Sequence, residues 1–325
     1  MSLSRASRNR LPHTLLPGGN PHVHSAPQQH SPPGAAVSAH KPADAVTKVA
    51  AVLDEAARTG VPCAPVRSFL PEADIEAAYA VQRLHVERGV TVGRRLVGRK
   101  IGLTSPAVQR QLGVNQPDFG ALFADMAVPE GRPIAPGRLL QPKVEAEVAL
   151  VLGADLPHRD PTVADLLRAT AFALPALEIV DSRIADWDIT IVDTVADNAS
   201  SGLYVLGGTP VPLDRIDLRA AAMTLTKNGE TVSRGTGADC LGSPLTAALW
   251  LASTLAGLGD PLRAGDIVLT GALGPMAVAA EGDEFTAYIE GLGTVTTTFA
   301  LAATEGVWPE HEHESTPRVR CQRPL

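Results

Sequence analysis

Two glutamates separated by one residue are the clearest candidates for chemistry in the sequence. Glu145 and Glu147 lie in an apolar run that continues to Leu152. Successive side chains of a β-strand point to opposite faces, so both carboxylates would share one face, with Cα atoms about 6.6 Å apart. Two carboxylates placed in this way can bind one hard divalent cation from the same side. For this segment alone, a half-exposed strand with its polar residues in solvent is the alternative.

A third acid strengthens the metal hypothesis. Glu178 is the one charged residue in the apolar stretch 175–180, and a buried charge is costly unless it is paired or bound to a metal. Three carboxylate ligands leave positions for water and substrate on octahedral Mg²⁺ or Mn²⁺. Residues 44–303 contain only two histidines, which favours an oxygen site over a zinc site. An ion pair between Glu178 and a Lys or Arg inside the fold is the alternative.

A lysine and an aspartate are candidates for proton transfer. Lys100 lies between Gly98 and Gly102 and next to an isoleucine, so it could be partly buried. Burial lowers the pKa of a lysine, which suits proton transfer. Asp118 lies in a turn-like segment that could face this lysine. A surface lysine and an aspartate that only stabilises a turn are the simpler interpretations.

Two further segments are candidates for binding an anionic substrate. The stretch 193–202 is dense in small polar residues, among them Asn198 and Ser200. These could donate hydrogen bonds to a carboxylate substrate, and capped turns are the alternative. The stretch 270–275 follows a clear strand, and backbone N–H groups near Thr270, Gly271 and Leu273 could hold an anion. The sequence lacks dinucleotide-binding and phosphate-loop spacing and the Gly-x-Ser-x-Gly pattern, so nucleotide use and triad hydrolysis have no support.

Composition restricts the class of protein that carries these residues. The chain has 325 residues, 45% of them hydrophobic, and a net charge of −7. The apolar fraction suffices for a core, and the acidic charge argues against nucleic-acid binding. Three cysteines without metal-binding spacing indicate a reducing, cytoplasmic setting. The longest apolar stretch, 245–258, is shorter than the roughly 18 residues of a membrane span, so no membrane is expected.

The charge is unevenly distributed. Residues 1–43 carry +4, contain no acid and hold seven of the 27 prolines, and residues 304–325 carry −1, which leaves −10 for residues 44–303. We expect 1–43 to be a disordered extension. Its prolines and glycines interrupt an amphipathic helix of the kind that a transit peptide forms. We expect 304–325 to be a flexible tail.

The elements that must position the candidate residues form an α+β pattern. Helical spacing predicts helices from Val46 to Gly60, over 72–88, from Ser105 to Gly113 and after Ser243. Alternating or short apolar runs predict strands at 144–152, 177–180, 204–206, 223–226, 266–270, 285–289 and 294–299. We therefore divide the body 44–303 into a helical N-terminal part, 44–125, and a β-rich metal-binding part, 126–303.

Taken together, these motifs resemble the 2-keto-4-pentenoate (2-hydroxypenta-2,4-dienoate) hydratase family of the fumarylacetoacetate hydrolase superfamily. The resemblance covers about 46–300 and rests on several long motifs in fixed order, at 98–126, 141–152, 175–187, 192–202 and 269–276. It implies a mixed β-roll with an N-terminal helical part and peripheral helices. It also implies homo-oligomers built from dimers, often decamers, that act in the cytosolic meta-cleavage degradation of aromatic compounds.

The resemblance also implies roles for the candidate residues. Glu145, Glu147 and Glu178 would hold Mg²⁺ or Mn²⁺, and Lys100 and Asp118 would carry out acid–base steps beside it. The substrate would be a 2-hydroxydienoate, to which water adds to give 4-hydroxy-2-oxopentanoate.

Two other functions stay open. The related 4-oxalocrotonate decarboxylase shares the acids, the lysine and the metal chemistry but releases CO₂, and the stretch 271–276 looks more like the hydratases. A non-catalytic partner subunit of a pathway enzyme is an alternative of another class. The presence of all three metal acids and of Lys100 argues against it.

Overall fold

The computed structural model describes residues 42–70, 74–105, 109 and 114–302. The expected extension 1–43 lies outside these residues up to Lys41, and the expected tail 304–325 lies outside them entirely. The helix expected from Ser105 to Gly113 also lies mostly outside them. Every candidate site residue lies inside.

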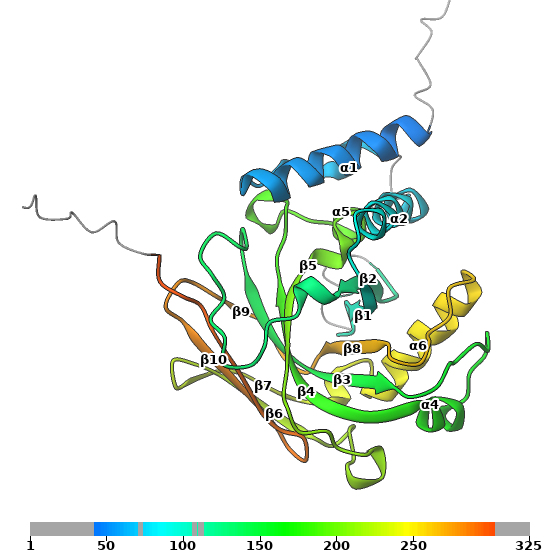
Figure 1. Ribbon diagram of the computed structural model, residues 1–325, viewed down its shortest axis with the longest axis vertical. Helices are drawn as coiled ribbons and strands as arrows, with labels where there is room; N and C mark the ends of the chain where they lie inside the picture. The colour runs from blue at the N-terminus through cyan, green and yellow to red at the C-terminus, as the bar shows by residue number, and fades with distance from the viewer. Residues whose placement is uncertain (1–41, 71–73, 106–108, 110–113, 303–325) are drawn as a thin grey trace, which may run out of the picture. The chain divides into compact units, whose positions relative to one another are not determined.

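A seven-stranded mixed sheet forms the centre of the body (Figure 1). Its order is β2-β1-β8-β3-β4-β5, and β9 pairs with β3. All pairs are antiparallel except β1 with β8. The strands are β1 (Leu96–Gly102), β2 (Asp118–Phe123), β3 (Lys143–Leu152), β4 (Thr170–Val180), β5 (Ser201–Leu206), β8 (Ile267–Ala272) and β9 (Ala277–Val278).

A second sheet of four antiparallel strands, in the order β11-β10-β6-β7, packs against β4. Its strands are β6 (Ala222–Lys227), β7 (Glu230–Thr236), β10 (Glu284–Ile289) and β11 (Gly293–Thr298). The expected α+β class is confirmed, as is the mixed sheet with peripheral helices.

Helices lie in two groups (Figure 1). The first comprises α1 (Pro42–Thr59), α2 (Ile75–Thr91) and α5 (Ile191–Ala196), which pack around Leu53 and Val81 beside β2. The second comprises α4 (Val163–Ala169) and α6 (Pro244–Gly257), of which α6 packs against β8. α6 begins as expected, with the Ser243 side chain accepting a hydrogen bond from Leu245 N and Pro244 at the first helical position.

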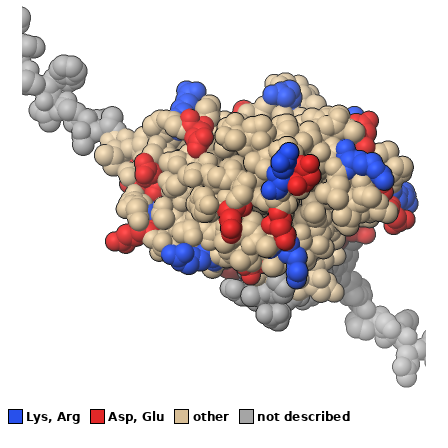
Figure 2. Space-filling view, turned by 90° about the horizontal axis from the view of Figure 1, so that it is seen from below, with Lys and Arg blue, Asp and Glu red and all other residues tan. Residues whose placement is uncertain are grey.

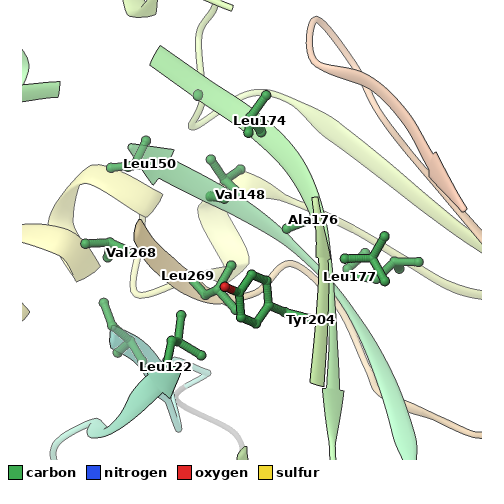
Figure 3. Packing of buried hydrophobic residues seen from close by; sticks show 14 of the residues in the cluster. Leu122, Val148, Leu150, Leu174, Ala176, Leu177, Tyr204, Val268 and Leu269 are labelled. Atoms are coloured by element: carbon green, nitrogen blue, oxygen red, sulfur yellow. The ribbon is translucent and has the colours of Figure 1, made fainter. Parts of the chain in front are cut away.

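The main core packs against the apolar face of β3, and the acidic residues lie on the other face of this strand. Val148 and Leu150 lie on the apolar face, with Leu177 of β4 nearby (Figure 3). The four-stranded sheet contributes Leu225 and Phe285 to the same buried cluster. Glu145 and Glu147 therefore project from the opposite face of β3, as the alternation predicts.

Two strands, β1 and β2, lie within the range 44–125 that we expected to be helical. They belong to the central sheet, so the first two helices, which end at Thr91, are the helical portion of this N-terminal range in the described chain. The sequence pattern does not predict β1, because Gly98, Arg99 and Lys100 interrupt its apolar residues. It hides β2 because all six residues of that strand are buried, which removes the alternation by which a half-exposed strand is recognised.

By length and composition one segment, Gly237–Gly257, could cross a membrane. Its continuous α-helix, α6, has only 14 residues and is therefore about 21 Å long, shorter than the roughly 30 Å of a bilayer core. Seven of its residues are buried in the fold. We therefore assign this segment to the protein core.

Charged side chains on the face in Figure 2 are of both signs and are spread among uncharged residues. No extended basic surface is visible on this face, which accords with the charge of −10 for residues 44–303.

We predict that Leu150→Ala lowers the free energy of unfolding in urea by about 2–5 kcal/mol, because Leu150 is fully buried. Leu167→Ala is the matched control, since Leu167 is 42% exposed and should cost less than about 1 kcal/mol. Equal losses for the two variants would contradict the packing of β3.

Candidate active site

Three carboxylates meet where β3 and β4 pair. Glu145 lies directly opposite Glu178, and Glu147 follows two residues along the same face. One carboxylate oxygen from each glutamate lies within 4.8 Å of the other two. Glu147 and Glu178 are 0% and 1% exposed, whereas Glu145 is partly exposed. The strand register thus produces a cluster that can hold one metal ion and opens on the Glu145 side.

Lys100 and Asp118 reach the same cluster from β1 and β2. Lys100 Nζ lies 3.2 Å from Glu178 Oε1, and both Lys100 and Asp118 are buried. Gly102 lies opposite Asp118 in the β1–β2 pair. A Cβ at Gly102 would collide with the Asp118 carboxylate, so glycine is needed there for the acid to turn inward. The structure therefore brings together all five residues expected to bind metal or transfer protons.

Several oxygens of this cluster have no hydrogen-bond partner. Within the described part of the chain these are Glu147 Oε1, both oxygens of Glu178 and Asp118 Oδ1, although Glu178 Oε1 has the ion pair with Lys100. Buried polar atoms in folded proteins are nearly always satisfied. Glu147 and Glu178 thus offer unpartnered oxygens in the cluster whose third member is Glu145, and carboxylate oxygens are the donors that Mg²⁺ and similar hard cations prefer. The residues present therefore fit a divalent cation.

Burial shifts the pKa of every acid in the cluster upward. Burial, reinforced by the charge of Glu178, raises the pKa of Glu145 to about 7 and that of Glu147 well above its ordinary value. Burial also raises the pKa of Glu178 and brings that of Asp118 to about 6. Without a cation, the cluster relieves its repulsion by retaining protons.

Lys100 departs from the expectation based on burial alone. Burial acts to lower its pKa, as we expected, but the carboxylates of Glu178, Asp118 and their neighbours outweigh burial, so the pKa is raised. Lys100 therefore carries its proton in this cluster. A divalent cation among the same carboxylates would weaken that hold, because it would neutralise the charges that attract the ammonium group.

The three residues predicted to bind an anion lie at the end of β8 or directly after it, and all three contact β3. Gly271 N donates to Glu147 Oε2 at 2.8 Å, Thr270 Oγ1 donates to Val148 O at 2.9 Å, and Leu273 N donates to Ala146 O at 3.0 Å. Gly271 has a φ of 111°, and a Cβ there would collide with Thr104. This segment positions Glu147 by fixing one of its oxygens.

Asn198 and Ser200 lie in a short 3₁₀ turn, Asn198–Ser200, that contacts β1 and β2. The Asn198 side chain accepts a hydrogen bond from Ala121 N and donates one to Ala121 O. Ser200 Oγ lies 3.2 Å from Thr194 Oγ1. Both residues and Ala199 have φ of 52–53°, a left-handed backbone that costs non-glycine residues about 1 kcal/mol or more each. Such strain is common at functional sites, and direct substrate contact by Asn198 and Ser200 stays a prediction.

Acids of the polar stretch 193–202 have structural partners. Asp193 accepts hydrogen bonds from Arg67 and caps the start of α5 through Thr190. Asp197 pairs with Arg183 at 2.5 Å. This stretch therefore connects the first group of helices, α1, α2 and α5, to β1 and β2.

Sequence reasoning missed two buried residues beside Glu147. Cys240 Sγ donates to Thr270 O at 2.9 Å, and burial followed by the charge of Glu147 raises its pKa to about 12. Thr104 packs against Gly271. Neither residue belongs to a motif, and only the tertiary structure places them here.

A cavity of 540 Å³ lies elsewhere, between α1, α2 and β5. Asp54, His85 and Arg183 line it, and Asn198 reaches it, but none of the five clustered residues does. Two of its arginines, Arg88 and Arg183, are already paired with aspartates. The cavity therefore does not compete with the carboxylate cluster as the reaction centre.

Comparison with known proteins identifies the family. The model of the fumarylacetoacetate (FAA) hydrolase C-terminal domain matches residues 97–300, the range that contains every candidate site residue. The chain belongs to the fumarylacetoacetate hydrolase family. The resemblance seen in the sequence motifs is thereby confirmed, and so is the curled mixed sheet expected of this family.

Relatives within the family are closely similar to this chain. A protein called 2-keto-4-pentenoate hydratase 2 from Dechloromonas aromatica is 61% identical over 251 residues, which cover 77% of this chain and 96% of the relative. The 2-keto-4-pentenoate hydratase of Burkholderia vietnamiensis is 57% identical over 256 residues, covering 79% and 98%. A solved structure of 4-oxalocrotonate decarboxylase from Pseudomonas putida G7, complexed with magnesium and adipate, aligns with a TM-score of 0.74 and 34% identity, covering 78% and 97%.

We predict that Mg²⁺ raises the melting temperature more at pH 8 than at pH 6. Because burial raises the carboxyl pKa values, the metal-free fold is most stable when these groups are protonated and loses stability as the pH rises through about 7. Mg²⁺ binds the deprotonated carboxylates. Deprotonation of Glu145 alone should make the affinity of the protein for Mg²⁺ about tenfold higher at pH 8 than at pH 6.

Differential scanning calorimetry with and without Mg²⁺ at the two pH values measures this effect. Glu145→Gln is the control and should show a smaller Mg²⁺ shift with a weaker pH dependence. A wild-type shift that is equal at both pH values, or larger at pH 6, would contradict metal binding by these carboxylates.

Proposed function

We propose that this chain is a divalent-metal-dependent hydratase, a hydro-lyase that adds water to 2-hydroxypenta-2,4-dienoate to give 4-hydroxy-2-oxopentanoate. The buried carboxylate cluster beside Lys100 and Asp118 carries the proposal, because its unpartnered oxygens fit a cation and its ammonium and carboxyl groups can transfer protons. The names of relatives 57–61% identical over almost their full length support the choice of reaction.

We assign the metal to Glu145, Glu147 and Glu178, with Mg²⁺ or Mn²⁺ as the ion. The magnesium in the related decarboxylase structure supports a divalent cation in this family. When bound, the cation supplies Lewis acidity that stabilises negative charge on the 2-oxygen of the substrate. Glu147 is the best oriented ligand, because Gly271 N fixes one of its oxygens and leaves the other free.

We assign the proton transfers to Lys100 and Asp118. The reaction requires a proton at C5 and loss of the 2-hydroxyl proton, which give 2-oxopent-3-enoate. Water then adds its oxygen at C4 and loses one proton, while C3 gains a proton. Lys100 holds a proton on Nζ and is suited to donate it to carbon. Asp118, whose pKa is about 6, is largely ionised at neutral pH and is suited to accept a proton from the attacking water.

We assign supporting roles to the remaining predicted residues. Thr270, Gly271 and Leu273 hold β3 and Glu147 in place, as their hydrogen bonds indicate. Asn198 supports β2 through Ala121, and Ser200 lies two residues further in the same strained turn. We keep direct contact of Asn198 and Ser200 with the substrate as a prediction. We place the protein in the cytoplasm as a homo-oligomer built from dimers, with a decamer as the larger assembly to test for. Light scattering coupled to size-exclusion chromatography would measure that assembly.

The reaction itself is tested by supplying 2-hydroxypenta-2,4-dienoate with Mg²⁺ and following the products by NMR. We expect 4-hydroxy-2-oxopentanoate to form, and Glu147→Gln to abolish its formation. The structural similarity to 4-oxalocrotonate decarboxylase defines the competing function. Release of CO₂ from 2-oxohex-3-enedioate without hydration of the dienoate would establish that function instead.

Lys100→Met tests the assignment of proton transfer. We expect kcat to fall by about 10²–10⁴-fold, because a positioned acid or base contributes about that much. Calorimetric Mg²⁺ affinity should stay the same or increase, since the variant removes a positive charge 3.2 Å from Glu178. An unchanged kcat with an unchanged pH–rate profile would remove Lys100 from proton transfer.

A further inference from the structure

Lys143 lies on the same face of β3 as Glu145 and Glu147, at the start of the strand. It is partly exposed, like Glu145, whereas Glu147, Glu178, Lys100 and Asp118 are all buried. The cluster opens on the Glu145 side, so Lys143 lies at its mouth. An anion that enters the site passes this ammonium group.

The ammonium group of Lys143 is held by an aromatic ring and not by an acid. Its Nζ lies 4.0 Å from the centroid of the Trp187 ring, a cation–π contact. Within the residues that the structure describes, Lys143 makes no ion pair with a carboxylate, although Glu145 is two residues away on the same face. Its N–H donors therefore remain available to a ligand.

Trp187 is held in place by a strained turn. Asp186 and Trp187 have φ of 59° and 55°, a left-handed backbone that non-glycine residues rarely adopt. Gln141, two residues before Lys143, fixes this turn. Its side chain accepts from Asp186 N at 2.8 Å and donates to Ile184 O at 2.8 Å, and its carbonyl accepts from Trp187 Nε1 at 3.1 Å. The strained turn is thus tied to the strand that carries the metal acids.

The net charge of the cluster indicates what a positive group at its mouth would do. The cluster contains four carboxyl groups and one ammonium group, which amount to −3 when all are ionised. A divalent cation reduces this charge to −1, so an anionic substrate still meets a negative site. One further positive charge at the mouth would neutralise the site before the substrate binds.

The position of the proton-transfer groups indicates which end of the substrate faces Lys143. Lys100 and Asp118 are buried beside Glu178, away from the mouth, so the reacting carbons must lie on the inner side. The carboxylate at the other end of the molecule then lies toward the opening. We propose that Lys143, held by Trp187, binds the carboxylate of a 2-hydroxy- or 2-oxo-carboxylate substrate at the mouth of the site, an inference that rests on the proposed function.

Calorimetric binding of oxalate to the Mg²⁺-loaded protein tests this proposal without requiring turnover. Lys143→Met keeps an unbranched side chain on Trp187 but removes the charge. We expect it to weaken oxalate binding about tenfold or more, because hydrogen bonds to charged groups contribute about 1.5–3 kcal/mol. Lys143→Arg should retain most of the affinity. In turnover with the dienoate, KM should rise more than kcat falls, and the dependence of kcat/KM on ionic strength should weaken.

Lys48→Met is the matched control, because Lys48 Nζ also lies 4.0 Å from an aromatic centroid, that of Phe69, in the helical group. It should leave oxalate affinity unchanged. A purely structural role for Lys143 would instead lower the melting temperature of Lys143→Met and leave oxalate affinity intact, which would overturn the proposal. Equal losses for Lys143→Met and Lys143→Arg would also overturn it.

The outcome for Lys143 is distinguishable from that for the hydratase reaction. Weaker oxalate binding by Lys143→Met, in a protein that does not hydrate the dienoate, would support the carboxylate site and reject the reaction. Normal hydration together with unchanged oxalate affinity would support the reaction and reject the carboxylate site. Failure of the wild-type protein to bind oxalate with Mg²⁺ would reject the carboxylate site as well.

Discussion

Four carboxyl groups, three of them buried, surround a single ammonium group, and the rest of the fold accommodates their charge. Glu147 and Glu178 are almost completely buried, and Lys100 balances only one of the negative charges. Transferring unpaired charge into a protein interior is costly. The raised carboxyl pKa values mean that the metal-free protein lowers this cost by keeping carboxyl groups protonated. A divalent cation would lower the same cost by neutralising the ionised carboxylates. We therefore regard the cation as part of the folded structure as much as of the reaction.

The fold positions these charges through the strand register and through a backbone hydrogen bond to Glu147. The antiparallel register of β3 and β4 places Glu145 opposite Glu178, and the backbone of β8 fixes Glu147 through Gly271. The apolar face of β3 anchors the strand in the main core (Figure 3). Because the acids project from a strand with a well-packed opposite face, the cluster is held rigidly and needs little reorganisation when a ligand binds.

Part of this arrangement could be predicted from the sequence. The alternation around Glu145 and Glu147 predicts a shared face, and the apolar run around Glu178 predicts burial, because both are local patterns. The approach of Lys100 to Glu178 depends on strand β1 and on pairings between strands far apart in the chain. The sequence does not predict β1, because glycines and charged residues interrupt its apolar pattern. The N–H groups of Gly271 and Leu273 could not be assigned from sequence, because only the topology shows that β3 already uses them. Lys143 and Trp187 were likewise recognisable only in three dimensions.

We propose that one divalent cation binds between Glu145, Glu147 and Glu178. A crystal structure with Mn²⁺ and oxalate, with anomalous data recorded at the manganese edge, would locate this cation. We expect one strong anomalous peak that contacts an oxygen from each of the three carboxylates. Oxalate should complete its coordination and extend toward Lys143. A peak elsewhere, or a cluster that stays without the cation at saturating Mn²⁺, would rule out metal binding by these three carboxylates.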